Sequence, residues 1–190
     1  MAGLRPPPVL DPAAGDWIFD STVLINCLDG TLAGHLTVKF ARRAHLADEV
    51  LAEIQRGPAG KAYARVNWFT KESLELERHL DEFRQLRLRW GSVPGADRGE
   101  AASIILANEF HWIFATDDGT AFATAQRRGI CVTRTPQLVL AMVRAGWLPA
   151  VDGWEAIRSM QRAGSHLGEL PWGTREQFEI LGDQPNFDTC

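Results

Sequence analysis

The sequence predicts an α/β fold in which a mainly parallel central sheet lies between layers of helices. Short apolar runs alternate along the chain with helical segments, most of about ten residues or more, a pattern typical of strand–helix units. The length fits one domain with appendages, because 190 residues with 45% hydrophobic composition can bury a full core. In addition, acidic residues recur where an apolar strand ends or a helix begins: Asp20, Glu53, Glu100, Asp117 and Asp118.

The expected strands are short apolar or β-branched runs, each next to a polar or helix-forming segment. They comprise residues 17–19, about 43–46, 62–68, 112–116 and 130–134. If all five pair side by side, the intervening helices cover the two faces of the sheet, as in other α/β proteins.

The expected helices show apolar stripes with helical spacing or begin and end at recognisable cap residues. They comprise residues 21–28, 48–56, 70–90, 100–110, 119–129, 136–145, 154–162 and 174–181. Gly57-Pro58 is expected to end the second of these helices, and Thr70 to cap the third. After Val151 the pattern loosens, which indicates an extension of short helices.

Charge and cysteine content exclude several classes of protein. The net charge of −4 and the pI near 5.7 lack the basic signature of a dedicated nucleic-acid-binding domain. They leave room for a nuclease, which needs only a local basic rim to contact phosphates. Cys27, Cys131 and Cys190 are far apart and form no CxxC pair, which argues against a disulfide framework and a structural zinc site. A reducing cytoplasm is therefore the expected location.

No apolar run approaches the roughly 18 residues that a membrane span requires, so we expect no membrane partner. Residues 1–15 contain three consecutive prolines and no continuous apolar segment. They are expected to form a flexible leader and not a signal peptide.

The position of the acidic residues predicts a shared carboxylate site. In an open parallel sheet, ligands bind outside the carboxyl ends of the strands, where side chains remote in sequence converge. Clustered carboxylates repel one another, so one is expected to take up a proton when no cation is bound. Oxygen ligands without His or Cys favour Mg²⁺ or Mn²⁺ over zinc. The sequence therefore predicts a divalent-metal site.

Each acidic residue also has a purely local explanation. Asp20 precedes a helix and is a good N-cap. Asp97 and Glu100 have the spacing of a capping box. Asp117 or Asp118 would complement the dipole of the helix that follows them. Glu53 lies at the edge of an apolar stripe, where a partly exposed glutamate is ordinary. Only their common placement favours a functional site.

Four segments, in this order, resemble conserved segments of PIN-domain proteins: WIFDSTVLI, ADEVLAEI, RGEAASIILANE and the stretch that begins ATDDGTAF. The resemblance covers residues 16–148. It implies a three-layer α/β/α catalytic domain preceded by the leader at 1–15. Residues 149–190 then form a helical extension packed on the domain. The charged segment at 70–90 and this extension are longer than in a minimal toxin of the family.

The resemblance also implies roles for individual residues. Asp20, Glu53, Glu100 and a fourth acid would form the catalytic site. The Thr-x-Asp pattern points to Asp118 for the fourth position, with Asp117 as the alternative. Metal ligands would then be Asp20, Glu100 and Asp118 or Asp117, with Glu53 completing the pocket or positioning a water.

Ser21 or Thr22 could hydrogen-bond a phosphate or a water on the metal, or be an ordinary first-turn residue. Two arginines, Arg98 and Arg134, lie near the expected acidic crevice and are candidates to contact phosphates.

These implications lead to an expected function. The protein is expected to be a Mg²⁺- or Mn²⁺-dependent endoribonuclease that hydrolyses RNA, as the toxin of a VapC-type pair restrained by an antitoxin. A homodimer is a further candidate assembly. The alternative is a non-catalytic PIN-like protein that acts through partner contacts.

Overall fold

Five parallel strands form one sheet in the computed structural model, which describes residues 7–56, 69–91, 97–168 and 170–190. The strands are β1 Trp17–Phe19, β2 Ala44–Ala47, β3 Thr70–Glu72, β4 Ile113–Ala115 and β5 Val132–Thr133. Their order across the sheet is β3-β2-β1-β4-β5. The predicted α/β class is confirmed, and every strand pair in the described part of the chain is parallel.

The strand order determines where a ligand site can form. The chain moves outward from β1 through β2 to β3, then returns to the other side of β1 for β4 and β5. The carboxyl ends of β1 and β4 therefore flank the point where the order reverses, the usual ligand crevice of open α/β sheets. Phe19 pairs with Ala115, and the Asp20 N–H donates to the Ala115 carbonyl at 3.0 Å. Asp20 is thus placed at this crevice.

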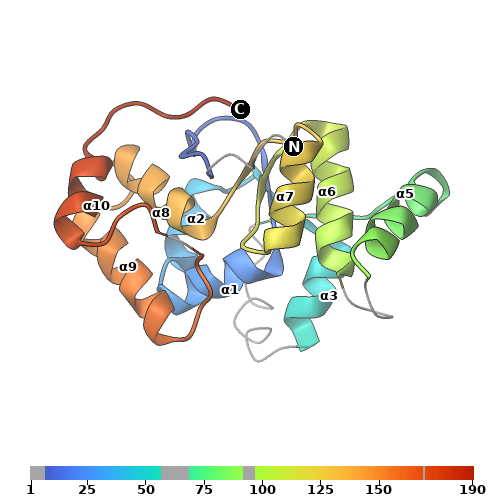
Figure 1. Ribbon diagram of the computed structural model, residues 1–190, viewed down its shortest axis with the longest axis horizontal. Coiled ribbons are helices and arrows are strands. Elements are labelled where there is room, and N and C mark those ends of the chain that lie inside the picture. The colour runs from blue at the N-terminus through green and yellow to red at the C-terminus, as the bar shows by residue number, and fades with distance from the viewer. Residues whose placement is uncertain (1–6, 57–68, 92–96, 169) are drawn as a thin grey trace.

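Helices cover both faces of the sheet and give the three layers (Figure 1). One side carries α1 Ser21–Asp29, α2 Ala33–Lys39, α8 Thr135–Arg144, α9 Ala150–Arg162 and α10 Arg175–Gly182. The other side carries α3 Asp48–Arg56, α5 Leu76–Arg89, α6 Arg98–Phe110 and α7 Gly119–Arg127. Each helix in these described ranges is too short or too polar to cross a bilayer.

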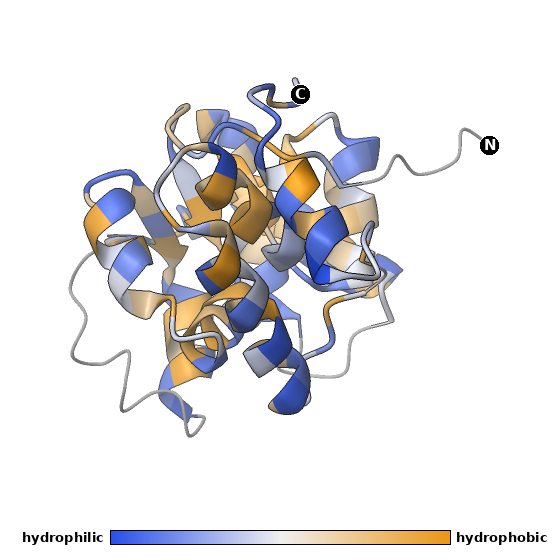
Figure 2. Ribbon diagram, turned by 90° about the vertical axis from the view of Figure 1, so that its left-hand side faces the viewer, coloured by the Kyte–Doolittle hydropathy of each residue, from blue (hydrophilic) through white to orange (hydrophobic). Residues whose placement is uncertain are grey.

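The core forms where the apolar faces of these layers meet. All of β1 is buried, and the Phe40 ring packs edge-on against both Trp17 and Phe19. The helices are banded, with hydrophobic and hydrophilic residues alternating along the ribbon (Figure 2). Among them α6 and α8 are buried over most of their length. An apolar helix with little polar face is typical of a core position.

The third strand differs from the prediction. Thr70 begins β3, not a helix, and α5 starts only at Leu76. Lys71 and Glu72 have little intrinsic strand preference, but the segment Thr70–Glu72 pairs with the buried β2 strand, with Thr70 opposite His45. Strand formation depends strongly on such neighbours. The strand predicted at 62–68 and the helix stop at Gly57-Pro58 lie outside the described residues.

Two other elements differ in extent. Helix α2 was not predicted, because its seven residues show too little apolar periodicity to be recognised locally. Helix α9 begins at Ala150, four residues before the predicted start. Pro149 precedes it in extended conformation, which marks the boundary better than the apolar stripe does.

The first described residues and the C-terminal tail meet at the β5 side of the sheet. Val9 and Leu10, within the segment expected to be a flexible leader, are buried. The Val9 N–H donates to the Asp188 carboxylate at 2.7 Å, and the Asp188 N–H donates to the Val9 carbonyl at 2.9 Å. Cys131 and Cys190 form a disulfide with a Cα–Cα distance of 5.3 Å. The spacing argument against a disulfide framework is therefore wrong for this pair, because folding returns the tail across 59 positions of sequence.

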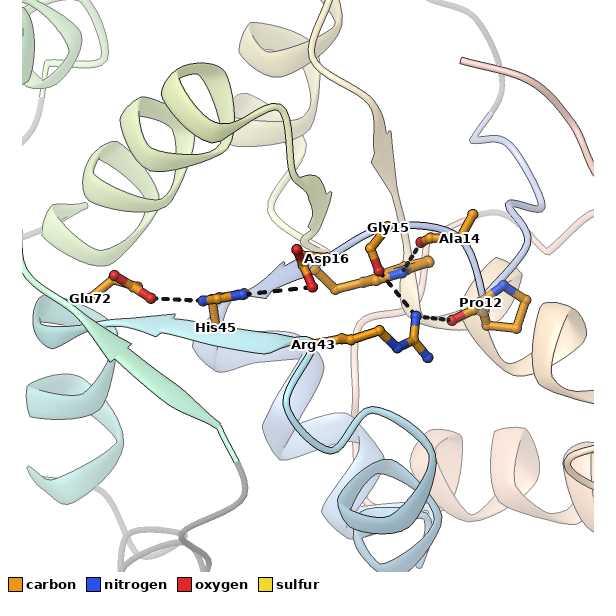
Figure 3. A network of polar contacts seen from close by, with 8 residues as sticks. Pro12, Ala14, Gly15, Asp16, Arg43, His45 and Glu72 are labelled. Carbon is orange, nitrogen blue, oxygen red and sulfur yellow. Dashed lines mark hydrogen bonds and ion pairs between the residues drawn. The ribbon is translucent and has the colours of Figure 1, made fainter.

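Polar contacts also anchor the leader at the amino ends of β1 and β2 (Figure 3). Arg43 donates to the Gly15 carbonyl at 3.0 Å. Beside it, the His45 ring lies between two carboxylates, with Nδ1 2.7 Å from Glu72 and Nε2 4.0 Å from Asp16 (Figure 3). Asp16 and Arg43 directly precede β1 and β2, so they lie at the end of these two strands away from Asp20.

Candidate metal centre

Asp20 lies between the last residue of β1 and the first turn of α1, and its side chain is fully buried. One carboxylate oxygen, Oδ1, accepts the Ser21 N–H at 2.7 Å. The other, Oδ2, accepts the hydroxyls of Thr22 at 2.8 Å and Thr116 at 3.0 Å. Asp20 therefore does cap α1, as the local explanation predicted. The same geometry holds its carboxylate rigidly at the carboxyl end of the sheet.

Glu53 reaches this position because α3 packs closely on α6. Its Oε1 accepts the Gly99 N–H at 2.9 Å, and its Oε2 lies 3.4 Å from the Ser21 hydroxyl. A Cβ at residue 99 would lie only 2.8 Å from Val50 Cγ2 and 2.7 Å from Glu53 Oε2, so glycine there allows the close approach of the two helices. Glu100, the next residue, is placed by the same helical turn.

Three of the predicted acids meet in one cluster. One oxygen from each of Asp20, Glu53 and Glu100 lies within 4.8 Å of the others. Glu100 Oε2 is buried and has no hydrogen-bond partner among the described residues. Buried acceptors are nearly always satisfied, so an oxygen of this kind needs an explanation. A divalent cation bound at this cluster would provide one, and oxygen-only donors suit Mg²⁺ or Mn²⁺. The residues present therefore fit such an ion.

Burial and mutual repulsion make this cluster reluctant to ionise. Burial raises the pKa of Asp20 to about 6, although the hydroxyls of Thr22 and Thr116 act in the opposite direction. Burial, followed by the charge of Asp20, raises the pKa of Glu100 to about 8. Burial also raises the pKa of Glu53. Without a cation the cluster thus retains a proton at neutral pH, mainly on Glu100, as the repulsion argument predicted.

Asp117 does not join the cluster. Its buried carboxylate accepts the Asn26 amide at 2.7 Å, the Thr135 N–H at 3.0 Å and the Thr135 hydroxyl. Asn26 belongs to α1 and Thr135 to α8, so Asp117 links both helices to the end of β4. Its oxygens serve contacts within the protein, and the geometry supports a structural role for this residue.

Asp118 also lies outside the group of three. It is the N-cap of α7 and accepts the Ala121 N–H at 2.7 Å, as the helix-end alternative predicted. Its own N–H donates to the Thr116 hydroxyl at 3.1 Å, the same hydroxyl that donates to Asp20. Thr116, the threonine of the Thr-x-Asp pattern, was not among the predicted site residues. It couples the position of Asp118 to that of Asp20.

The capping-box alternative for Glu100 is wrong. Asp97 precedes α6 in the left-handed region, at φ 53°, and its side chain makes no cap hydrogen bond. A capping box requires the N-cap side chain to accept an N–H from the first turn. Glu100 is instead directed toward Asp20 and Glu53.

The predicted phosphate-binding residues differ in their surroundings. Arg98 is exposed at the start of α6. Arg134 donates to the Asp117 carbonyl at 3.1 Å, and its guanidinium lies 4.6 Å from the centre of the Phe122 ring. Ser21 Oγ lies 3.5 Å from Asp20 and 3.4 Å from Glu53, so it sits between two of the clustered carboxylates.

Different losses of stability are expected for the two neighbouring aspartates. Asp117→Ala removes three hydrogen bonds and leaves buried Asn26 and Thr135 groups unpaired. At roughly 1 kcal/mol per bond, it should lower the free energy of unfolding by about 2–3 kcal/mol. Asp118→Ala removes one helix cap and should cost about 1 kcal/mol. Urea unfolding of both variants measures the difference. Equal losses would contradict the structural role of Asp117.

A family model described as a PIN domain, DUF3368, matches residues 16–170. The matched span contains all five strands of the sheet and the three clustered acids. It also continues past residue 148 through α9. No curated protein matches the chain.

Proposed function

The chain belongs to the PIN-domain family, and from this premise we propose that it is a divalent-metal-dependent endoribonuclease that hydrolyses RNA phosphodiester bonds. PIN domains are generally nucleases, so a hydrolase is the coarse assignment. The observation that supports the ribonuclease is the cluster of Asp20, Glu53 and Glu100, in which one buried Glu100 oxygen has no hydrogen-bond partner among the described residues. A fold alone does not define chemistry, whereas a preformed carboxylate site constrains it.

Asp20 and Glu100 would hold the metal ion, and Glu53 would complete the acidic pocket. When bound, Mg²⁺ or Mn²⁺ supplies positive charge that stabilises the phosphate oxygens and favours ionisation of a nucleophilic water. We keep Asp118 as the proposed fourth acid, since it shares the Thr116 hydroxyl with Asp20. Asp117 is a poorer candidate because its carboxylate is already used by Asn26 and Thr135.

Glu53 is the residue best placed to handle a proton. The Gly99 N–H holds its Oε1, which leaves Oε2 beside the Ser21 hydroxyl to receive a proton from the attacking water. Its raised pKa brings it closer to neutral pH, where a general base works most effectively. Ser21 would orient the water or a phosphate oxygen between Asp20 and Glu53.

Arginine side chains would provide the affinity for the RNA backbone. We propose that Arg98 and Arg134 contact phosphates on either side of the acidic cluster, because guanidinium groups bind phosphate oxygens strongly. Cys27 takes no part in the chemistry, because it is fully buried and burial raises the pKa of its thiol. A thiolate nucleophile is not needed for hydrolysis assisted by a metal.

The biological role we propose is that of a cytoplasmic toxin restrained by an antitoxin, with a homodimer as a candidate form. A neighbouring short reading frame whose product binds and inhibits the protein would support this role. The disulfide between Cys131 and Cys190 is unusual for a reducing compartment. Counting free thiols in protein isolated directly from cells therefore tests the cytoplasmic assignment.

Metal-dependent cleavage is the direct test of the proposed activity. Purified protein is incubated with structured and unstructured RNA in Mn²⁺, then in EDTA, and again after Mn²⁺ is restored. Cleavage should stop on chelation and return with the metal. If the protein binds Mn²⁺ but cuts no RNA or single-stranded DNA, the non-catalytic binding protein is the better description.

A further inference from the structure

We propose that a hollow beside the acidic cluster binds the nucleotide next to the scissile phosphate, with Arg56 and Arg98 contacting the phosphate of that nucleotide. The inference rests on the proposed function and adds to it a substrate-positioning site. The hollow has a volume of ≈ 240 Å³ and lies between α3 and the first turn of α6. Its lining residues are Asp48, Glu49, Ala52, Glu53, Arg56 and Arg98.

Glu53 connects the hollow to the site of chemistry. It lines the hollow and also contributes an oxygen to the cluster with Asp20 and Glu100. A strand of RNA with one phosphate at the cluster would therefore continue directly into the hollow. The next nucleotide is the part of the substrate that can occupy it.

The two arginines are available for an anionic ligand. Both side chains are exposed, and neither makes a hydrogen bond or an ion pair within the described ranges. Arg56 lines the hollow together with Glu53, and its charge acts against the rise that burial causes in the pKa of Glu53. Two guanidinium groups at the edge of a hollow can grip a phosphate through several N–H donors.

The carboxylates of the hollow favour a nucleotide over a simple anion. Asp48 accepts the Ser73 hydroxyl, and Glu53 accepts the Gly99 N–H, so part of their capacity is already used. Glu49 has one buried oxygen without a partner among the described residues. A nucleotide offers the ribose hydroxyl and base N–H groups to such acceptors and its phosphate to the arginines. Inorganic phosphate would satisfy only the arginines.

Equilibrium binding tests the site without depending on catalysis. The probe is a fluorescent single-stranded octaribonucleotide, titrated with the full-length protein in EDTA at several salt concentrations. Arg56→Ala/Arg98→Ala should lower affinity about tenfold at low salt. It should also reduce the slope of log K against log[salt] by about 0.7 for each phosphate that the variant no longer neutralises. Arg56→Lys/Arg98→Lys should keep the slope and lose part of the affinity, because lysine preserves charge but not the planar fork.

The matched control removes the same charge elsewhere. Arg158 and Arg162 are exposed on α9, on the opposite side of the sheet (Figure 1). Arg158→Ala/Arg162→Ala should leave both the affinity and the salt slope unchanged. If the two double variants lose affinity equally, general charge explains the binding and the proposed site is overturned. Unchanged affinity in the Arg56/Arg98 variant overturns it as well.

Cleavage kinetics separate this inference from the proposed function. In Mn²⁺, the Arg56/Arg98 variant should raise KM about tenfold with little change in kcat, since the site binds a part of the substrate that does not react. A neutral methylphosphonate linkage is placed in the RNA at successive positions away from the scissile bond. At one of these positions it should weaken RNA binding by the wild-type protein but not by the Arg56/Arg98 variant. Normal KM in the variant overturns the inference and leaves the nuclease intact. If the Arg56/Arg98 variant selectively loses RNA binding while the wild-type protein cleaves no RNA in Mn²⁺, the binding site is upheld and the nuclease is contradicted.

Discussion

Asp20→Asn is expected to lower the rate of RNA cleavage by about 10²–10³-fold, the loss typical when one electrostatic stabiliser of a transition state is removed. Asp20 is fully buried at the centre of the acidic cluster, so its charge acts in a site with little screening. RNA affinity should change little, because exposed arginines supply most of the attraction to the backbone. Single-turnover cleavage and anisotropy binding measure the two quantities separately.

The asparagine variant should remain folded, which makes the result interpretable. Its side-chain oxygen can still accept the Ser21 N–H, and the hydroxyls of Thr22 and Thr116 can rotate to accept from the new amide. Asp152→Asn, on the exposed surface of α9, controls for the change in charge. Cleavage near the wild-type rate by Asp20→Asn would remove Asp20 from the catalytic site.

Metal binding is expected to have the largest effect on stability. In the metal-free protein, the pKa values of Asp20, at about 6, and Glu100, at about 8, are raised above those of the unfolded chain. Between pH 4 and 8 the folded protein therefore binds more protons than the unfolded chain, and stability falls as pH rises. Mn²⁺ binds the same oxygens only in the folded state, so its stabilising effect should grow as these protons leave.

The expected size of the stabilisation by Mn²⁺ follows from mass action. A free Mn²⁺ concentration about 1,000 times the Kd adds about 4 kcal/mol, which corresponds to a rise in Tm of about 10 °C for a chain of this size. The rise should be larger at pH 8 than at pH 5. Thermal unfolding with and without Mn²⁺ at both pH values measures it. Identical melting curves at pH 8 would contradict a metal site in this cluster.

Glu100→Gln tests the same site by removing one of its negative charges in place of adding a cation. Removal of its charge relieves repulsion with Asp20, so the metal-free variant should be more stable than wild type at pH 8. It should also lose most of the response to Mn²⁺ and most of the pH dependence. Glu155→Gln, an exposed change on α9, should behave like wild type. A variant that keeps the full Mn²⁺ response would show that Glu100 is not a ligand.

The sequence by itself determined the α/β class and most of the elements. Apolar runs such as Trp17–Phe19 can be recognised locally because burial on both faces demands nearly continuous hydrophobicity. The convergence of Asp20 with Glu53 and Glu100 could also be predicted. Parallel strands bring their carboxyl ends to one edge, so an acid just after a strand or on a helix packed at that edge has few other places to point.

Only the tertiary structure decided which role each of two adjacent acidic residues takes. Asp117 and Asp118 are adjacent and chemically identical. Asp117 nevertheless accepts hydrogen bonds from Asn26 and Thr135, while Asp118 caps α7. Their separation depends on where α1 and α8 pack, which local sequence does not encode. The preference for glycine at position 99 likewise comes from the approach of Val50 and Glu53 on another helix.

The third strand and the disulfide have the same explanation. Thr70–Glu72 becomes a strand because β2 offers it a partner, and Cys131 meets Cys190 because the tail returns to β5. Periodicity and capping arise from interactions within a few residues, so sequence patterns reveal them. Strand partners, disulfides and the direction of a buried carboxylate arise from contacts between distant segments, and these exist only once the chain has folded.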